Sequence, residues 1–274
     1  MPRADQCDLH SHTLHSDGAL TPEALVDLAA ERGVGVLAVT DHDTVAAFSA
    51  AAARGRLRGV EVVAAIELSV DYDGRDIHLL GYFIQHPEVL RAALESLAKS
   101  RIDRADVILA RLRSLGVDLD SDAVRARAQG PVGRPHIAAE LIERGFASHF
   151  NEAFDRWLGH GKPAYVPKVA PSLAEGVALL RRAGAAPVVA HPGASDVDDC
   201  MAQFAAAGVV GLEVHHPKHD PVAVRRYLRH ARAHGFVATG GSDFHRAAPG
   251  AALPGDVTVP RAVLDALRAR AGEV

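Results

Sequence analysis

The segment DLHSHTLHSDG, residues 8–18, places three histidines and two aspartates within eleven positions near the N-terminus. The histidines do not form a continuous run, so the segment does not resemble an affinity tag. His10 and His12 are two positions apart, and residues with this spacing project to the same side of a strand. A single buried histidine is more often a hydrogen-bonded core residue than a ligand. The rest of the chain must therefore decide between a polar loop and part of a metal site.

The composition limits the classes of protein to which the chain can belong. With 274 residues, 48% of them hydrophobic, it can form one large domain or a domain with an insertion. The net charge of −4 argues against a broad basic surface for duplex DNA, although a local group of cations could hold a small anion. Cys7 and Cys200 lack a CxxC spacing, which argues against a thiolate zinc site and a disulfide framework. No apolar run approaches the roughly 20 residues of a membrane span and no signal-peptide pattern is present, so we expect a cytoplasmic protein without a membrane partner.

Short apolar segments predicted as strands alternate with amphipathic helical segments, which is typical of α/β folds. Asp73-Gly74, a tight-turn signal, joins the third and fourth of these strands, so we expect an antiparallel hairpin there. Residues 86–170 break the alternation, because they contain consecutive helical patterns without a strand. We therefore predict an α/β body, residues 1–85 and 171–274, with a helical insertion. The predicted strands are 7–13, 34–40, 60–70, 76–83, 186–191, 209–214 and 236–243.

Residue types that bind metals recur at the ends of these predicted strands. In parallel α/β barrels the carboxyl ends of the strands converge on one face, where catalytic groups collect. Isolated core histidines would not explain this recurrence, so the pattern predicts a metal site. The residues concerned are His10, His12, His42, Glu67, His78, His191, Asp243 and His245.

The types of ligand indicate the chemistry of this site. Imidazoles and carboxylates without thiolates suit zinc, manganese or iron. The potential ligands outnumber those that one ion requires, so Glu67 is expected to bridge two or three ions. Ions roughly 4 Å apart activate water and stabilise the oxygens of a phosphoryl displacement, which predicts phosphate ester hydrolysis.

Two other kinds of site are disfavoured. Ser242 lacks the GxSxG pattern of a serine nucleophile. The GVGVLA segment at 33–38 resembles a dinucleotide-binding loop, but it precedes a strand instead of following one. Asp43 or Thr44 is expected to cap the following helix.

Six motifs follow one another along the chain: DLHSHTLHSDG, AVTDHDT, IELSV, IHLLGY, VVAHPG and GSDFH. Together they resemble the motifs of the PHP (polymerase and histidinol phosphatase) metallohydrolases. The resemblance covers nearly the whole chain and implies a distorted seven-stranded (β/α) barrel that binds three metal ions, usually manganese. GPVGRPHIAAELIERG and LGHGKPAYVP in the insertion resemble the branch of nucleoside 3′,5′-bisphosphate phosphatases that also trims short RNA from the 5′ end. The insertion at 86–170 is therefore expected to be a substrate-binding cap.

The resemblance also implies roles for individual residues. Asp8 is expected to orient a ligand imidazole from outside the metal site, and His191 or His245 to protonate the leaving oxygen. Arg134 and His136 resemble substrate-binding residues of this branch, and a guanidinium can contact a phosphate through two hydrogen bonds. The implied ligands are His10, His12, Glu67 and Asp243 for the first ion, Glu67, His78 and His191 for the second, and Asp17, His42 and His245 for the third. Further candidates for phosphate binding are Lys99, Arg101, Lys218 and His219.

The expected reaction is hydrolysis of the 3′-phosphate of a nucleoside 3′,5′-bisphosphate to give the 5′-monophosphate and phosphate, with short RNA as a second substrate. One alternative is a histidinol-phosphate-type phosphomonoesterase, which would use the same ions on a different alcohol. Another is a non-enzymatic metal-binding regulatory module, which would not need an open coordination position. The GRPH segment at 133–136 favours the bisphosphate, because histidinol phosphate has no second phosphate for it to bind.

Overall fold

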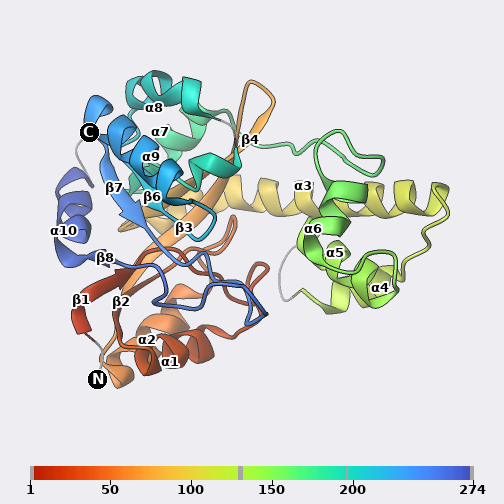
Figure 1. Ribbon diagram of the computed structural model, residues 1–274, viewed down its shortest axis with the longest axis horizontal. Helices are drawn as coiled ribbons and strands as arrows, with labels where there is room; N and C mark the ends of the chain where they lie inside the picture. The colour runs from red at the N-terminus through yellow and green to blue at the C-terminus, as the bar shows by residue number, and fades with distance from the viewer. Residues whose placement is uncertain (1–2, 129–131, 196, 272–274) are drawn as a thin grey trace.

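The computed structural model describes residues 3–128, 132–195 and 197–271 (Figure 1). Residues 129–131, which include the first two residues of the GPVGRPH segment, lie outside the described part. One mixed sheet forms the body, with the strand order β7-β6-β5-β4-β3-β2-β1-β8. The strands are β1 (Arg3–Asp8), β2 (Val34–Val39), β3 (Glu61–Tyr72), β4 (Arg75–Tyr82), β5 (Ala186–Val189), β6 (Gly211–His215), β7 (Val237–Gly240) and β8 (Val259–Pro260).

The sheet curves into a nearly closed barrel. Neighbouring strands are parallel except on both sides of β4 and between β1 and β8. Backbone hydrogen bonds connect the segments that follow β1 and β7: the Asp243 N–H donates to the His10 carbonyl at 2.9 Å, and the His12 N–H donates to the Phe244 carbonyl at 2.9 Å. The predicted distorted barrel is confirmed, with one strand more than predicted. The additional strand, β8, has only two residues, which is too short for an alternating pattern in the sequence.

The first strand differs from its prediction. Residues 7–13 were expected to form it, but β1 ends at Asp8, and Ser11 then forms an isolated parallel bridge with Phe244. After Asp8 the extended chain still bonds to the end of β2, where the Thr40 N–H donates to the Ser11 carbonyl at 2.8 Å, and it also bonds to β7, where the Leu9 N–H donates to the Gly240 carbonyl at 3.3 Å. His10 and His12 consequently lie in the segment that closes the barrel instead of within a regular strand.

The hairpin of β3 and β4 matches its prediction and places two candidate ligands. Asp73 and Gly74 both have positive φ, 51° and 77°, as a two-residue turn between twisted strands requires. In the resulting register Glu67 lies opposite Leu80, and Ser69 lies opposite His78. Because side chains alternate between the two faces of a strand, this register determines which residues of the hairpin face the barrel interior.

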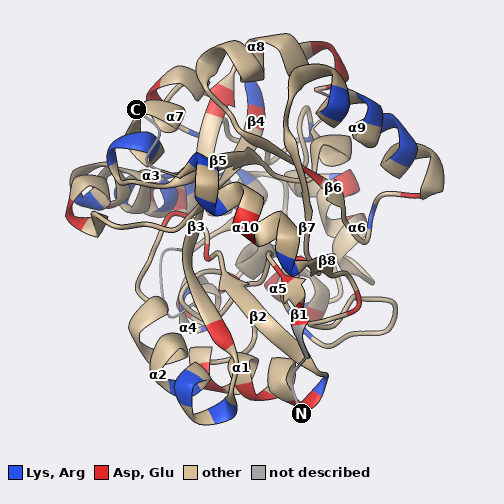
Figure 2. Cartoon of the chain, turned by 90° about the vertical axis from the view of Figure 1, so that its left-hand side faces the viewer, with Lys and Arg blue, Asp and Glu red and all other residues tan. Residues whose placement is uncertain are grey.

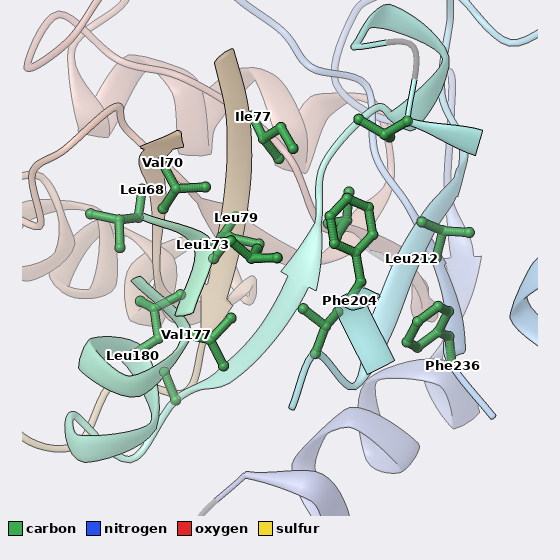
Figure 3. Close-up of a cluster of buried hydrophobic side chains, with 14 of the residues drawn as sticks. Leu68, Val70, Ile77, Leu79, Leu173, Val177, Leu180, Phe204, Leu212 and Phe236 are labelled. Atoms are coloured by element: carbon green, nitrogen blue, oxygen red, sulfur yellow. The ribbon is translucent and has the colours of Figure 1, made fainter. Parts of the chain in front are cut away.

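An apolar cluster covers the outer face of this hairpin. Figure 3 shows Leu68 and Val70 of β3 close to Leu180, with Phe204 on the other side of the cluster. Gly176 permits this close packing, since a Cβ there would lie 2.3 Å from a methyl carbon of Val70. The outward packing of Leu68 and Val70 leaves the alternate residues of β3, including Glu67, directed to the interior.

Helices cover the outside of the barrel. The α1 helix begins after Thr21, whose hydroxyl accepts the Ala24 N–H at 3.2 Å, and Ser172 and Glu175 form a capping box at the start of α7. Both starts agree with the sequence prediction. These helices are α1 (Pro22–Glu31), α2 (Phe48–Arg58), α7 (Leu173–Arg182), α8 (Met201–Ala207), α9 (Pro221–His234) and α10 (Arg261–Arg270), with short 3₁₀ turns at Pro192–Ala194 and Asp198–Cys200.

The segment expected to be an insertion contains helices and, in its described residues, no strand. Figure 1 shows α3 leaving the barrel toward the group formed by α4, α5 and α6. The far part of α3 and this group share a cluster of buried apolar residues, among them Ile108, Leu112, Ile137 and Leu141. The elements of the segment are α3 (Pro87–Ser114), α4 (Ser121–Ala126), α5 (Arg134–Glu143), α6 (Phe150–Ala153) and a π-helical turn at Phe154–Leu158.

The basic residues of two outer helices lie far apart. In the view of Figure 2, the basic stretches of α2 and α9 lie at opposite ends of the molecule, with acidic residues between them. Among the described residues, no helix is long and apolar enough to cross a lipid bilayer.

Candidate active site

Glu67 lies at the centre of the histidine and carboxylate cluster and is fully buried. Five imidazole nitrogens surround its carboxylate, and they come from four segments of the barrel rim, since His10 and His12 both follow β1. The distances to the nearer Glu67 oxygen are 3.3 Å from His10 Nε2, 3.2 Å from His12 Nε2, 3.2 Å from His42 Nδ1, 2.8 Å from His78 Nδ1 and 3.0 Å from His191 Nε2.

Asp17 and Asp243 extend the cluster on the side away from β4. Asp243 Oδ1 lies 3.3 Å from His10 Nε2 and 3.2 Å from His12 Nε2. Asp17 Oδ1 lies 3.4 Å from His245 Nε2, and its other oxygen lies 3.7 Å from His42 Nε2. All nine residues predicted as metal ligands from the sequence therefore lie in one cluster.

The cluster fits divalent cations on its own chemistry. Three groups offer ligand atoms that all lie within 4.8 Å of one another: His12, Asp17, His42 and His245; His10, His12 and Glu67; and His42, Glu67 and His78. Burial alone would raise the pKa of Glu67, but the surrounding imidazoles, His42 first, hold that pKa well below its ordinary value. Nitrogens of His12, His42 and His78 lie close to Glu67 but do not form hydrogen bonds with it. These buried nitrogens, and Nδ1 of His191, have no hydrogen-bond partner among the described residues. Such groups are costly to bury without a partner, and a bound cation would satisfy them.

The backbone is strained at three positions of this region. Asp43, His191 and Asp243 have positive φ, of 54°, 24° and 48°. This region of backbone conformation is unfavourable for residues other than glycine, typically by about 1–3 kcal/mol, and such strain collects at functional sites. The strained conformations place His191 and Asp243 at the barrel rim, directed into the cluster.

Glu213 and His216 form hydrogen bonds with residues of the cluster, and the sequence analysis did not identify them. His10 donates its Nδ1–H to Glu213 at 2.9 Å, and the His191 backbone N–H donates to the other Glu213 oxygen at 2.7 Å. His216 donates its Nε2–H to Asp243 at 3.1 Å. Both residues lie in LEVHHP, at the end of a predicted strand, so the same strand-end criterion could have identified them.

Asp8 does not have the role that the family resemblance implied. It contacts no imidazole ring in the described part of the chain. Its carboxylate accepts backbone N–H groups instead, from Ser242 and Gly255 at 2.9 Å each and from His10 at 3.4 Å. Burial raises the pKa of Asp8 to about 6 despite these hydrogen bonds. Asp8 thus holds together the segments after β1 and β7, and Glu213 is the residue that orients the His10 ring.

Asp43 does not cap the following helix, contrary to expectation. The α2 helix begins after Ala47 without a side-chain cap. Asp43 instead accepts the Ser69 N–H at 2.7 Å and the Arg101 Nε–H at 2.8 Å. Burial would raise the pKa of Asp43, but Arg101 and Lys168 hold it well below its ordinary value. This ion pair attaches α3 to the barrel rim beside the cluster.

A cavity of about 260 Å³ separates the cluster from the helical segment. Glu67, His78, His191 and Asp243 line one side of it, and cationic residues line the other. Two of these cations share a carboxylate: Arg134 donates to Asp76 at 3.0 Å, and Lys168 donates to it at 3.4 Å. The cations that line this cavity are Arg101, Arg104, Arg134, Lys168 and Lys218.

Arg104 lies in an environment that favours a bound anion. Its Nε–H donates to the Val166 carbonyl at 2.8 Å, but its buried Nη2 has no hydrogen-bond partner among the described residues. Burial, and then the charge of Arg134, lower its pKa to about 10. Neither Arg104 nor Lys168 was identified in the sequence, because no motif marks them and only the folding of α3 against the 159–170 segment brings them together.

The remaining candidates for phosphate binding are divided between the cavity and other places. Arg134, Arg101 and Lys218 line the cavity. His136 does not line it; its Nδ1 accepts the Gly133 N–H at 3.0 Å and caps α5. Lys99 is exposed outside the cavity.

His219 is also outside the cavity and has a structural role. It is buried, donates to the Val214 carbonyl at 2.9 Å and accepts the Gly193 N–H at 3.2 Å. Both of its ring nitrogens are therefore occupied by the backbone, which leaves neither for a phosphate.

A barrel with such a cluster at its rim, facing a cationic cavity, defines the class of metal-dependent hydrolases. The chain belongs to the PHP domain family, whose model matches residues 8–160. The predicted family is thereby confirmed.

Relatives with assigned activities agree with this family. The chain is 36% identical to a 3′,5′-nucleoside bisphosphate phosphatase of Chromobacterium violaceum, over 89% of this chain and 87% of that protein. It is 34% identical to the 5′-3′ exoribonuclease Rnm of Escherichia coli, over 93% of this chain and 90% of that protein. These names describe the two activities that the sequence analysis expected.

Solved structures also share the fold. One is an amidohydrolase of Chromobacterium violaceum with bound sulfate and no metal, with a TM-score of 0.88, 34% identity and 96% of each chain covered. Another is a protein of Bifidobacterium adolescentis assigned as a metal-dependent phosphoesterase, with a TM-score of 0.88 and 28% identity over 99% of this chain and 98% of the other.

Proposed function

We propose that this protein is a metal-dependent phosphatase that hydrolyses the 3′-phosphate of nucleoside 3′,5′-bisphosphates, giving the nucleoside 5′-monophosphate and phosphate. Short RNA with a 5′-phosphate is the second proposed substrate. The observation that carries the proposal is the position of Arg104, whose buried Nη2 has no hydrogen-bond partner among the described residues, in one cavity with Glu67. One cavity thus offers two separate places for phosphate groups, as a bisphosphate requires.

The metal centre would hold three ions, with manganese as the first candidate and iron or zinc as alternatives. Such ions would supply Lewis-acid stabilisation of the phosphoryl oxygens and an activated water. Glu67 is the proposed bridging ligand, since five imidazoles approach its two oxygens. The proposed ligands are His10, His12, Asp17, His42, Glu67, His78, His191, Asp243 and His245.

The chain's own residues would position the substrate. Arg104, Arg134 and Lys168 would bind the 5′-phosphate, with the guanidinium groups donating hydrogen bonds to its oxygens. The helices of residues 86–170 would act as a cap that excludes water from the cavity. His191 and His245, which line the cavity, are the two candidates to protonate the leaving 3′-oxygen.

This arrangement favours the bisphosphate over a histidinol-phosphate-type substrate. A substrate with one phosphate would leave the buried Nη2 of Arg104 without a partner, and buried groups without partners disfavour binding. The cavity also argues against a purely regulatory metal module, because it gives small molecules a route to the metal cluster.

Phosphate release from a panel of nucleotides and sugar phosphates, with manganese added, tests the proposal. We expect 3′,5′-bisphosphates to be hydrolysed with a higher kcat/KM than 3′-monophosphates or histidinol phosphate, and a chelator to abolish the activity. A preference for histidinol phosphate would contradict the proposed substrate. No hydrolysis of any ester by the metal-loaded protein would contradict the proposed enzyme class.

Arg104→Ala and Arg134→Ala test the second phosphate site. A charge-assisted hydrogen bond contributes about 1.5–3 kcal/mol, so each change should lower kcat/KM on the bisphosphate by roughly 10- to 150-fold. On a 3′-monophosphate, which has no 5′-phosphate, the loss should be small. Arg113→Ala on the exposed part of α3 removes the same charge and serves as the control. Equal losses on both substrates would mean that these arginines act on the reacting phosphate or on the fold.

A further inference from the structure

A second cavity, of about 270 Å³, opens on the other side of the cluster and is called here the side groove. It meets the main cavity at Lys218, Asp243 and His245, which line both. From there it continues between Pro217 and the loop that follows β7. The residues that line only the side groove include Pro217, Ser242, Arg246, Ala251 and Ala252.

The side groove contains cations without carboxylate partners. Within the described part of the chain, neither Lys218 nor Arg246 forms an ion pair. Arg246 is held in place by an aromatic contact, because its guanidinium carbon lies 4.4 Å from the centre of the Phe150 ring of α6. Its side chain is partly buried, so this charge is fixed near the groove instead of moving freely in solvent. Together the two cations make the groove suitable for an anion.

The two proposed substrates differ in the space that they require beside the cluster. A bisphosphate ends at the 3′-phosphate that reacts, so the main cavity is sufficient for it. In RNA the reacting phosphate carries a second ester bond, to O5′ of the next nucleotide. That nucleotide needs space beside the cluster and away from the cations that bind the 5′-phosphate. The side groove begins at Asp243 and His245 and provides this space.

We propose that the side groove binds the RNA chain on the 3′ side of the cleaved bond, with Lys218 and Arg246 contacting the following phosphate. This inference rests on the proposed function of the main cavity. In the reaction, water adds to phosphorus and the P–O3′ bond breaks. The oxygen leaves with a proton as the 3′-hydroxyl of the released 5′-mononucleotide. The shortened RNA retains the phosphate as its new 5′-phosphate, so it can enter the next cycle.

Arg246→Ala and Ala252→Trp test the groove by two independent means, loss of charge and loss of space. We compare kcat/KM on a 5′-phosphorylated trinucleotide with kcat/KM on a nucleoside 3′,5′-bisphosphate. The ratio of the two should fall about 10-fold or more in each variant, because only the trinucleotide extends into the groove. Arg229→Ala on α9, a residue that does not line the groove, removes the same charge and should leave the ratio unchanged.

The outcomes separate this inference from the proposed function. An unchanged ratio in both groove variants would overturn the inference, as would wild-type protein that hydrolyses the bisphosphate but not the trinucleotide. Wild-type protein that hydrolyses neither substrate would instead contradict the proposed function. Retained bisphosphate hydrolysis in a variant also shows that its active site is folded.

Discussion

At the scale of single residues, the hydrogen bond from His10 to Glu213 shows how a buried carboxylate prepares a metal ligand. In the neutral ring, donation from Nδ1 leaves the other ring nitrogen of His10 with the lone pair that a cation requires. That nitrogen, Nε2, lies 3.3 Å from both Glu67 and Asp243. Glu213 thus selects the tautomer of His10 that can bind a cation, and its second oxygen holds the strained backbone of His191.

Glu213→Gln should therefore weaken metal binding. The amide is nearly the same size but has no charge, and loss of such a supporting partner typically costs about 10- to 100-fold in metal affinity. Titration of the metal-free variant with manganese in a calorimeter measures this effect without using activity. Glu61→Gln, at a half-exposed site paired with Arg268, is the matched control. An affinity equal to that of the wild type would show that Glu213 does not position the ligands.

At the scale of elements, Glu140 joins α4 to α5 in the helical segment. It is only 2% exposed, and its carboxylate accepts hydrogen bonds from Arg127 at 2.7 Å and from Arg144 at 2.9 Å. Burial would raise the pKa of Glu140, but these two arginines hold it below its ordinary value of 4.5. The ionised form is therefore the one that stabilises the fold.

Glu140→Gln should lower the free energy of unfolding at pH 7 by about 1–3 kcal/mol, because Arg144 loses its charged partner and Arg127 loses the buried one of its two. A lowered pKa stabilises the folded state above pH 4.5, and this contribution is lost as the pH falls through the folded-state pKa. The difference from the wild type should therefore persist at pH 5 and shrink at more acidic pH. Urea unfolding at several pH values provides the measurement.

Glu143→Gln is the matched control for this change. Glu143 also pairs with Arg127, but its side chain is 66% exposed, so its loss should cost at most about 1 kcal/mol. If Glu140→Gln were no more destabilising than this control, or equally destabilising at every pH, the proposed ion-pair contribution would be wrong.

At the scale of the whole molecule, the candidate metal ligands connect segments from across the barrel. His10 and His12 follow β1, His42 follows β2, and Glu67 and His78 lie on the β3–β4 hairpin. The remaining ligands follow β5 and β7 or lie in the loop before α1. Bound cations would therefore connect most of the barrel rim, and removing them should destabilise the entire fold.

Chelated protein should melt at a lower temperature than protein with manganese. At a free manganese concentration of 100 times Kd, binding adds about 2.7 kcal/mol to the free energy of unfolding, which corresponds to roughly 5–10 °C in Tm. Differential scanning calorimetry of the metal-free protein, with and without manganese, measures the shift. Glu67→Gln should show a much smaller shift. Equal shifts in both proteins would place the stabilising ion outside the cluster.

The local features of this protein were predictable from the sequence alone. The Asp73-Gly74 turn, the helix starts at Thr21 and Ser172 and most strand positions follow from periodicity and capping, which depend on residues close together in the chain. The candidate ligands could also be recognised, because each lies at a strand end within a short motif. Strand ends of a barrel converge, so their convergence in one cluster followed from the predicted fold.

Tertiary structure alone decided the contacts between groups that lie far apart in the sequence. His10 and Glu213 are 203 positions apart, and Asp8 reaches the backbone of Gly255 across 247 positions. Arg104 lines a cavity with Glu67 only because α3 is attached to the barrel rim through the ion pair of Arg101 with Asp43. Periodicity describes the geometry of one element, whereas these contacts depend on how several elements pack. For that reason the sequence predicted the candidate ligands, and only the folded chain showed which residues support them and which cations line the cavity beside them.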